Sequence, residues 1–408
     1  MKKKLLVLAY EYYPTENANT RIIRNTCGIL SETYGIDLVT VKKPGPEEAE
    51  KFRVIRVPEY SFHREKCTGT VTPLILARMA AEKALGKLAH DETRMLERLY
   101  GRGIRKAVRV SDYDAVLSFS APFLPHGCAS RLVRGTGVPW IAVCLDPYFS
   151  HRIFGPERLE ERKKREEAVM EAARKVIITY PTDRDYLRAG VAFRDKIIGA
   201  EMPGIAPKGT APKGSDPFGT RCGFFGSLYR EIRDPRAAVA LFSRITGEEI
   251  TMTFAGGLAD GTKEEFFPEG CGCAYAGELH GEALQRQYAE TDVLVNIGNA
   301  VDNQMPSKIF EYISTGKPVI NIYKSPECPT LKYLERYPLA LNLYERDITE
   351  KPEESAEKAR AFCLAHRGER VDPDIIGKLF AGNTFEAFAE TLDRALRDET
   401  AEPAGKEN

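Results

Sequence analysis

The sequence has no long hydrophobic run and no excess of charge of either sign. No stretch approaches the roughly 18 consecutive apolar residues that a membrane-spanning helix needs. The 408 residues carry 59 Lys plus Arg and 59 Asp plus Glu, so the net charge is zero. Proteins dedicated to nucleic acid are usually basic, and this balance therefore argues against a nucleic-acid partner. The length predicts two domains, each with its own core.

The sequence also lacks a metal-binding pattern. It has nine Cys and six His, and the only close cysteine pair is Cys271 with Cys273. Zinc sites usually need four suitably spaced ligands. We therefore predict no metal and free thiols in a reducing, cytoplasmic compartment. The first ten residues are lysine-rich and then apolar, like a signal peptide. The apolar run stops at Glu11 and no small-residue cleavage site follows, so we interpret it as a first strand.

The loop after that strand contains no glycine between Tyr10 and Ile22. The G-x-G-x-x-G pattern of dinucleotide enzymes is thus missing, and we predict no cofactor. A helix is predicted over 21–33, with Thr20 as its cap. Short apolar segments alternating with amphipathic helices predict a parallel α/β sheet in each half of the chain. The Pro- and Gly-rich stretch 201–219 between the halves is predicted to be an interdomain linker.

The most informative stretch is 292–320. It predicts a buried strand, a polar loop, a helix that ends at Gly316, and a second strand. The start of such a helix is an anion site, to which Ser307 adds a hydroxyl and Lys308 a charge. Glu311 lies on roughly the same face, where a carboxylate can accept hydrogen bonds from the two hydroxyls of a ribose. This arrangement predicts a nucleotide site, and the alternative is that Lys308 and Glu311 form an ordinary surface pair.

The segment Pro306-Ser-Lys-Ile-Phe-Glu-Tyr-Ile-Ser-Thr-Gly-Lys-Pro-Val-Ile resembles the donor-site segment of GT-B glycosyltransferases, in particular glycosyltransferase family 4. That family has a Glu-x7-Glu motif here. Its first Glu contacts the transferred sugar and its second binds the donor ribose. Glu311 matches the second Glu, whereas Asn303 stands where the first would be. Asn303 can form hydrogen bonds but carries no charge, and Asp302, one residue out of register, is a candidate substitute.

The resemblance also covers 221–234, where family 4 has an Arg and a Lys that neutralise the donor diphosphate. The first of these positions falls near Ser227 and the second near Arg233. Arg233 is therefore the expected charge partner, and Arg230 is a candidate replacement for the missing first residue. Gly226 and Ser227, in the turn after the strand, are further donor-binding candidates. The alternative for the two arginines is exposure to solvent.

In the first half, the resemblance to family 4 covers 113–147. Two apolar strands are predicted to end near Ser120 and at Asp146, and ligands bind at the strand ends of an open parallel sheet. Ser120, His126 and Asp146 are therefore acceptor-side candidates, together with Asn19 in the first loop. The alternative for His126 is a helix-start residue with a satisfied imidazole, and for Asn19 a solvated turn.

The segment 63–110 is helical in pattern and basic, with eleven Lys or Arg against five acids. A basic amphipathic segment can rest on an anionic membrane surface. This predicts a peripheral location at the inner face of the membrane. The alternative is a helical insertion packed on its own domain.

The resemblance implies the α/β fold called GT-B, in which two Rossmann-like, doubly wound domains face a cleft. We predict an acceptor-side domain at 1–200, a donor-binding domain at 220–383, a helix at about 384–397 that packs back on the first domain, and a disordered tail at 398–408. The implied activity is retaining, metal-independent transfer of a sugar from a UDP- or GDP-linked donor to a glycan or lipid-linked acceptor, in cell-surface polysaccharide or glycolipid assembly. The implied catalytic residues are Arg233, Lys308 and Asn303. Two rivals are a sugar-nucleotide epimerase on the same fold and a non-catalytic nucleotide-sugar-binding partner of a glycan-assembly complex.

Overall fold

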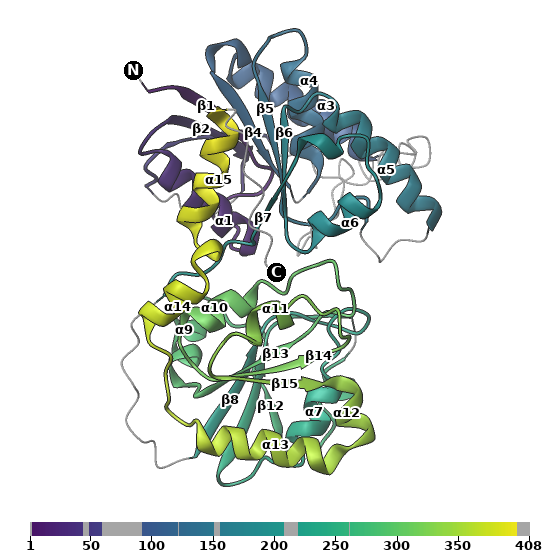
Figure 1. The fold of residues 1–408 in the computed structure, drawn as a ribbon, viewed down its shortest axis with the longest axis vertical. Helices are drawn as coiled ribbons and strands as arrows, with labels where there is room; N and C mark the ends of the chain where they lie inside the picture. Colours follow the sequence, from purple (N-terminus) through teal and green to yellow (C-terminus); the bar gives the residue numbers. More distant parts are fainter. Residues whose placement is uncertain are drawn as a thin grey trace, which may run out of the picture. The chain divides into compact units, whose positions relative to one another are not determined.

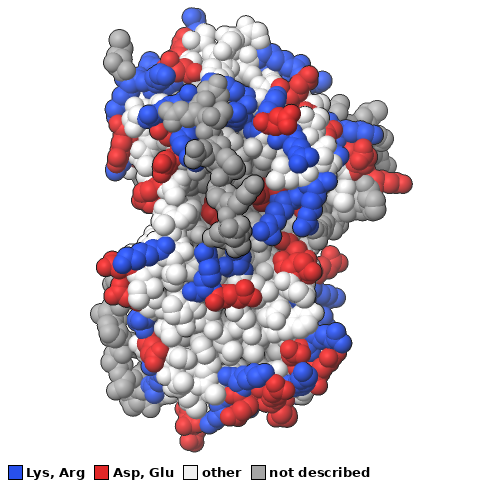
Figure 2. Space-filling model, in the orientation of Figure 1, with Lys and Arg blue, Asp and Glu red and all other residues white. Residues whose placement is uncertain are grey.

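The computed structural model describes residues 2–43, 49–58, 92–120, 122–150, 156–207, 219–260 and 262–397. The chain divides into two compact units. The first consists of Met1–Ala200 and Phe388–Asn408, and the second of Glu201–Ala387. Each unit is built around one parallel β-sheet with helices against it (Figure 1). On the face shown in Figure 2, Lys and Arg alternate with Asp and Glu over both units, as the zero net charge predicts.

The first unit contains a seven-stranded sheet in the order β3-β2-β1-β4-β5-β6-β7, in which all neighbouring strands are parallel. The strands are β1 (Lys4–Leu8), β2 (Gly35–Val41), β3 (Arg53–Val57), β4 (Ala115–Phe119), β5 (Trp140–Cys144), β6 (Lys175–Thr179) and β7 (Ile197–Ala200). The helices are α1 (Ala18–Leu30), α3 (Glu92–Ala107), α4 (Leu124–Val133), α5 (Pro156–Met170), α6 (Thr182–Arg188) and α15 (Phe385–Arg397). The central strands are apolar throughout because helices cover both faces of the sheet.

The second unit contains a six-stranded sheet in the order β12-β10-β8-β13-β14-β15, also parallel. Its strands are β8 (Thr220–Phe225), β10 (Ile250–Ala255), β12 (Cys273–Tyr275), β13 (Val293–Ile297), β14 (Val319–Tyr323) and β15 (Ala340–Tyr344), and two short strands, β9 (Leu228–Tyr229) and β11 (Leu258–Asp260), pair separately. The helices are α7 (Arg236–Phe242), α8 (Lys263–Phe266), α9 (Gly281–Glu290), α10 (Lys308–Ser314), α11 (Leu331–Leu334), α12 (Glu345–Glu350), α13 (Pro352–Ala365) and α14 (Pro373–Leu379).

Both sheets reverse their strand order at one point. In the first unit the chain moves outward from β1 through β2 to β3 and then returns to place β4 on the other side of β1. The second unit repeats this pattern, with β8 at the centre and β13 on its other side. This is the doubly wound Rossmann order, and ligands of such sheets bind beyond the carboxyl ends of the strands at the reversal.

The predicted start of the first helix was wrong. The first helix begins at Ala18 rather than at residue 21, and its cap is Asn17 rather than Thr20. Thr20 instead completes a capping box, in which its hydroxyl accepts from the Asn17 amide while the Asn17 side chain accepts from the Thr20 amide. The first part of the predicted linker is not a loose connector. Met202 and Ile205 are buried, and the Ile205 amide donates to the carbonyl of Asn383 at 3.0 Å.

Helix α15 belongs to the first unit from Phe388 onward. Arg174, which precedes β6, donates to the carbonyls of Ala395 and Leu396 at 3.1 and 2.7 Å. Tyr34, in the turn before β2, bonds Asp393. Of the predicted basic segment 63–110, the structure describes only residues from Glu92 on, where α3 lies, and the predicted tail 398–408 lies outside the described residues. Within the described ranges, no helix is long and apolar enough to cross a membrane.

Candidate functional site

The turn after β8 lies at the strand reversal of the second unit. Gly226 and Ser227 follow β8 directly, and Gly226 donates to the carbonyl of Ala255 at the end of β10. Gly256, which follows Ala255, has a φ of +148° and lies so close that a Cβ atom built on it would be 1.9 Å from the Gly226 carbonyl oxygen. Only glycine fits at Gly256, so the backbone of the two strand ends comes together at this edge of the sheet.

Arg233 is placed at the same edge by a tight backbone turn. Its amide donates to the carbonyl of Tyr229 at 2.8 Å, and the Tyr229 amide donates back at 3.2 Å. The carbonyl of Ile232, inside this turn, accepts from the amide of Ala300 at 2.7 Å. The loop after β9 is thereby fixed to the loop after β13, and the Arg233 side chain starts from a well-defined position.

The Arg233 guanidinium bridges the strand reversal. Its Nη1 donates to the Ser227 carbonyl after β8 at 3.3 Å, and its Nε and Nη2 donate to Asn299 Oδ1 after β13 at 3.2 and 2.8 Å. Both acceptors are uncharged, and Arg233 forms no ion pair with any residue that the structure describes. Burial lowers the pKa of this guanidinium. Because neutral oxygens hold this half-buried guanidinium, its positive charge remains available to bind an anion.

Asn299 was not identified from the sequence. It is one of several polar residues in the loop after β13, and nothing in its local pattern distinguishes it. The structure buries it to 2% exposure, and its Nδ2 donates to the carbonyl of Gln304 at 3.2 Å. This second bond fixes the amide so that its oxygen faces Arg233.

Lys308 and Glu311 lie on one face of α10, as predicted. Their side chains form an ion pair at 3.2 Å and remain partly exposed. The helix is shorter than predicted, with only seven residues. The amides of Ile309 and Phe310 already donate to the carbonyls of Pro306 and Ser307, so these two do not serve an anion. Any phosphate contact from this segment therefore comes mainly from the Lys308 ammonium and the Ser307 hydroxyl.

Aromatic residues connect α10 to the end of β8. The Tyr312 hydroxyl accepts from the amide of Phe225 at 3.0 Å and lies 3.3 Å from the Phe225 carbonyl. Tyr288, on α9, stacks on the Phe225 ring with a centroid distance of 4.3 Å. The Lys308 ammonium lies 5.9 Å from the centroid of the Tyr288 ring. These contacts form a continuous path from the glycine turn after β8 to the Lys308–Glu311 pair.

The first unit also has polar side chains at the carboxyl ends of its strands. Asn19, in the first turn of α1, donates to Asp146 at 3.0 Å, and Asp146 follows β5. Ser120 follows β4, and its hydroxyl accepts from the amide of Leu145 at 3.3 Å. Three of the four predicted acceptor-side residues thus lie on adjoining segments at the same edge of the sheet.

The loop that carries Asp146 is firmly held. Tyr186, on α6, accepts from the amide of Tyr148 at 3.2 Å, and its hydroxyl donates to Glu166. Glu166, buried on α5, accepts from the amide of Phe149 at 3.1 Å, and burial raises its pKa to about 8. These partners order the backbone of the loop, while Asp146 itself stays partly exposed.

A scan against protein-family models found no match, and a search of curated proteins found none either. Solved structures of glycosyltransferases do match over nearly the whole chain. Sucrose-phosphate synthase from Thermosynechococcus elongatus superposes with a TM-score of 0.65 at 14% identity, over 97% of this chain and 99% of that one. HepE of Anabaena, in complex with UDP, gives 0.63 at 11% identity, over 97% and 100%. An E. coli structure described as trehalose-6-phosphate bound with UDP-2-fluoro glucose gives 0.62 at 12% identity, over 98% and 100%.

The chain has the GT-B fold. The prediction of two Rossmann-like domains is confirmed, since each unit has its own parallel sheet with the reversal described above. In the GT-B frame, the predicted donor residues Gly226, Ser227 and Arg233 meet at the reversal of the second unit. Lys308 and Glu311 are connected to it through α10.

The surroundings of three further residues considered from the sequence are as follows. Arg230 is half exposed and forms an ion pair with Glu265 of α8 at 2.5 Å. Its guanidinium is therefore not part of the contact between Arg233 and Asn299. Asn303 is buried to 2% exposure. Asp302, considered as a substitute for the missing Glu, accepts from the Ser325 hydroxyl at 2.7 Å.

His126 has the environment of a buried helix residue whose imidazole already has its partners. It is fully buried in α4, its Nδ1 lies 2.7 Å from the Ser118 hydroxyl, and its Nε2 lies 3.7 Å from Cys144 Sγ. The Trp140 indole donates to the same Ser118 hydroxyl at 2.7 Å. Burial lowers the pKa of His126 to about 3, so the imidazole is neutral. This environment, a neutral and enclosed imidazole, is the one expected of a packing residue.

Proposed function

We propose that this protein is a glycosyltransferase that takes a sugar from a nucleotide-sugar donor and transfers it with retention of configuration. The observation that carries the proposal is the Arg233 guanidinium, which spans the strand reversal of a Rossmann-like unit and has only neutral partners there. Cleavage of the sugar–phosphate bond places negative charge on the departing diphosphate, and a cation already in position stabilises that charge.

The roles within the second unit follow from charge and position. Arg233 would grip the diphosphate through its planar fork. Lys308 would leave Glu311 for a phosphate oxygen, since a phosphate carries more charge than the carboxylate that now holds it. Glu311 would then accept from the ribose hydroxyls. Asn303 would contact the transferred sugar as a neutral hydrogen-bonding group, where the resembling family has a carboxylate.

We assign the acceptor to the first unit. The Asn19–Asp146 pair offers a carboxylate oxygen and an amide at the carboxyl edge of the sheet, suited to sugar hydroxyls. The acceptor proposed is a glycan or a lipid-linked sugar of cell-surface assembly, with the protein in the cytoplasm or peripheral at the membrane. We propose that the transfer uses only the nucleotide-sugar, the acceptor and the side chains of the protein, without a metal or a cofactor. In the part of the chain that the structure describes, no group of three or more His, Cys, Asp or Glu side chains is placed to hold a metal ion.

The proposal is tested by product analysis. The purified protein is incubated with UDP- and GDP-sugars and a panel of glycan and lipid-linked acceptors, in the presence of a chelator. UDP is tried first, because two of the matching structures hold UDP or a UDP-sugar. The proposal is supported if nucleoside diphosphate is released and the acceptor gains a sugar. The new glycosidic bond must have the same anomeric configuration as the donor. An isomerised nucleotide-sugar without any acceptor product would instead identify an epimerase.

A second candidate function is supported by Asn303. A buried neutral residue at that place cannot supply charge to the transferred sugar, which fits a non-catalytic subunit that binds the nucleotide-sugar for a partner enzyme. Exchange of Asn303 for Glu separates the two. A non-catalytic subunit stays inactive or gains transfer only in the variant, whereas a working enzyme transfers sugar with its natural Asn303.

A further inference from the structure

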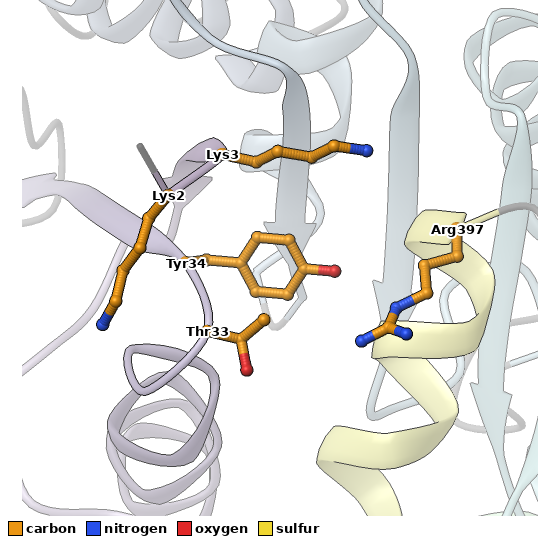
Figure 3. A pocket seen from close by; sticks show the side chains of 5 residues that line it. All are labelled: Lys2, Lys3, Thr33, Tyr34 and Arg397. Carbon is orange, nitrogen blue, oxygen red and sulfur yellow. The ribbon is translucent and has the colours of Figure 1, made fainter.

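A cavity of about 680 Å³ opens at the amino-terminal edge of the first unit's sheet. Its lining residues are Lys2, Lys3, Thr33, Tyr34 and Arg397 (Figure 3). They come from three separate segments: the residues before β1, the turn between α1 and β2, and the last residue of α15. The chain therefore assembles this cavity by folding, and no local sequence pattern could have revealed it.

Among the described residues, the lining is cationic and hydroxylic and includes no carboxylate. Figure 3 shows the Tyr34 hydroxyl and the Arg397 guanidinium facing one another, with the Lys3 side chain extending past the Tyr34 ring in the same direction as the hydroxyl. Lys2 points away from these groups and donates to the carbonyl of Ser31 at 2.8 Å, after the end of α1. The two cations, the Lys3 ammonium and the Arg397 guanidinium, come to this cavity from different segments and are the donors left for an anion, because Tyr34 gives its single hydroxyl proton to Asp393.

Asp393 holds the Tyr34 and Arg397 side chains in place. Its Oδ1 accepts from the Tyr34 hydroxyl at 2.5 Å, and its Oδ2 accepts from Arg397 Nη2 at 2.8 Å. The Asp393 carboxylate neutralises the charge of Arg397, whereas Lys3 forms no ion pair with any described residue. The acids that follow Arg397 in the sequence, Asp398 and Glu399, lie outside the described residues. The described groups around the cavity therefore keep a positive balance.

The cavity is distinct from the proposed donor and acceptor sites. β1 runs from Lys4 at the cavity edge to Leu8 at the opposite edge, where Asn19, Ser120 and Asp146 lie. A strand of five residues is about 16 Å long. One small ligand cannot occupy both edges of the sheet, so the cavity is a separate place on the first unit.

We propose that this cavity binds a phosphate-bearing ligand. Arg and Lys are the side chains that form charge-assisted hydrogen bonds to phosphate oxygens, and Thr33 adds a hydroxyl. The volume exceeds that of a single phosphate ion and accommodates a phosphorylated sugar or a lipid headgroup. The shared chemistry is a phosphomonoester or diphosphate held between Lys3 and Arg397, from either a soluble metabolite or a membrane surface.

The first experiment is calorimetric titration with inorganic pyrophosphate in saturating UDP, which keeps the proposed nucleotide site filled. The test variant is K3A/R397A. The matched control is K164A/R360A, which also removes two exposed cations, each of them paired with a surface Glu away from the cavity. Pyrophosphate is expected to bind the wild type and the control alike, within twofold. The double variant should bind at least about tenfold more weakly, because two charge-assisted bonds are lost.

The second experiment separates the two sources of phosphate. Flotation with vesicles of phosphatidylcholine alone, or with added phosphatidate, is compared for the same three proteins. Phosphatidate-dependent flotation that K3A/R397A loses and the control keeps assigns the site to a lipid headgroup, and pyrophosphate binding without flotation assigns it to a soluble ligand. Equal behaviour of K3A/R397A and the control in both experiments overturns the proposal. If UDP does not bind, pyrophosphate can still be compared between K3A/R397A and the control, since both variants keep the residues of the proposed nucleotide site unchanged.

Discussion

The contact between Arg233 and Asn299 leads to a prediction in which nucleotide affinity falls while the stability of the folded protein stays about the same. Asn299 Oδ1 accepts from both Nε and Nη2 of Arg233. The exchange of Asn299 for Asp keeps the size of the side chain and turns a neutral acceptor into a charged one. The exchange also removes the Nδ2 donor to the Gln304 carbonyl, but the new carboxylate pairs with the guanidinium directly, which offsets both that loss and the cost of burying the charge. We therefore expect the folded protein to be about as stable as the wild type.

The same exchange should strongly weaken binding of a nucleoside diphosphate. The cation that awaits the diphosphate would already be neutralised, and a new negative charge would face the ligand. Two unit charges about 6 Å apart at an effective dielectric constant of about 20 repel by about 3 kcal/mol. This corresponds to an affinity about 100-fold lower. Asn299→Ala removes the acceptor that orients Arg233 and the bond to Gln304 but adds no charge, so the affinity of this variant should fall about tenfold, less than that of Asn299→Asp.

The assay combines urea unfolding with calorimetric titration of UDP and GDP for the wild type, N299A and N299D. The reasoning requires N299D to be the weaker binder and the more stable of the two variants. If N299D binds the preferred nucleotide within twofold of the wild type, Arg233 does not meet the diphosphate and the site is misplaced. If N299D unfolds far more easily than N299A, the Arg233–Asn299 contact is not as close as described.

Three further predictions follow from particular contacts. Burial raises the pKa of Glu166 from 4.5 to about 8, so the folded state holds a proton that the unfolded state has lost over this range. The contribution of Glu166 to the free energy of unfolding is therefore fully present below pH 4.5. It falls by about 1.4 kcal/mol per pH unit from there to about pH 8. Urea unfolding at several pH values should show this slope in the wild type but not in Glu166→Gln. Gly256→Ala should destabilise the protein by at least about 2 kcal/mol and weaken nucleotide binding, because the new Cβ would displace the Gly226 backbone, and thermal unfolding with UDP titration measures both. Arg230→Ala should change nucleotide affinity less than twofold and stability by less than about 1 kcal/mol, since it breaks only a surface ion pair; a larger loss of affinity would restore Arg230 to the donor site.

The features that the sequence predicted well depend on local patterns. The continuous apolar strands predicted parallel sheets, because only strands covered on both faces have that composition. Pro306 and Gly316 marked the ends of α10, and Gly316 has the positive φ, +72°, expected just past a helix. The spacing of Lys308 and Glu311 predicted that they share a face, and they form an ion pair there.

The features that were missed depend on contacts between distant parts of the chain. Arg233 and Asn299 are 66 positions apart, and only the strand order brings them together. The burial of His126 was not predicted, because the sequence does not show that Ser118 and Cys144, on two neighbouring strands, lie against its ring. The first helix was placed too late because Thr20 fits a cap as well as Asn17 does, and only backbone geometry decides between them.

The central claim is that the second unit binds a nucleoside diphosphate at the strand reversal. The most direct test is a thermal-shift titration of the wild type and Glu311→Ala with UDP, GDP and ADP. The control is Glu335→Ala, an exposed acid in the same unit. A ligand that binds only the folded state stabilises it by about 2.7 kcal/mol at 100 times its dissociation constant.

We predict that one nucleotide raises the melting temperature of the wild type and of the Glu335→Ala control by the same amount. Glu311→Ala should require about 10- to 150-fold more nucleotide for that shift, because a charge-assisted hydrogen bond contributes about 1.5–3 kcal/mol. A wild type that no nucleotide stabilises, or a Glu311→Ala variant that responds as fully as the control, would contradict the account.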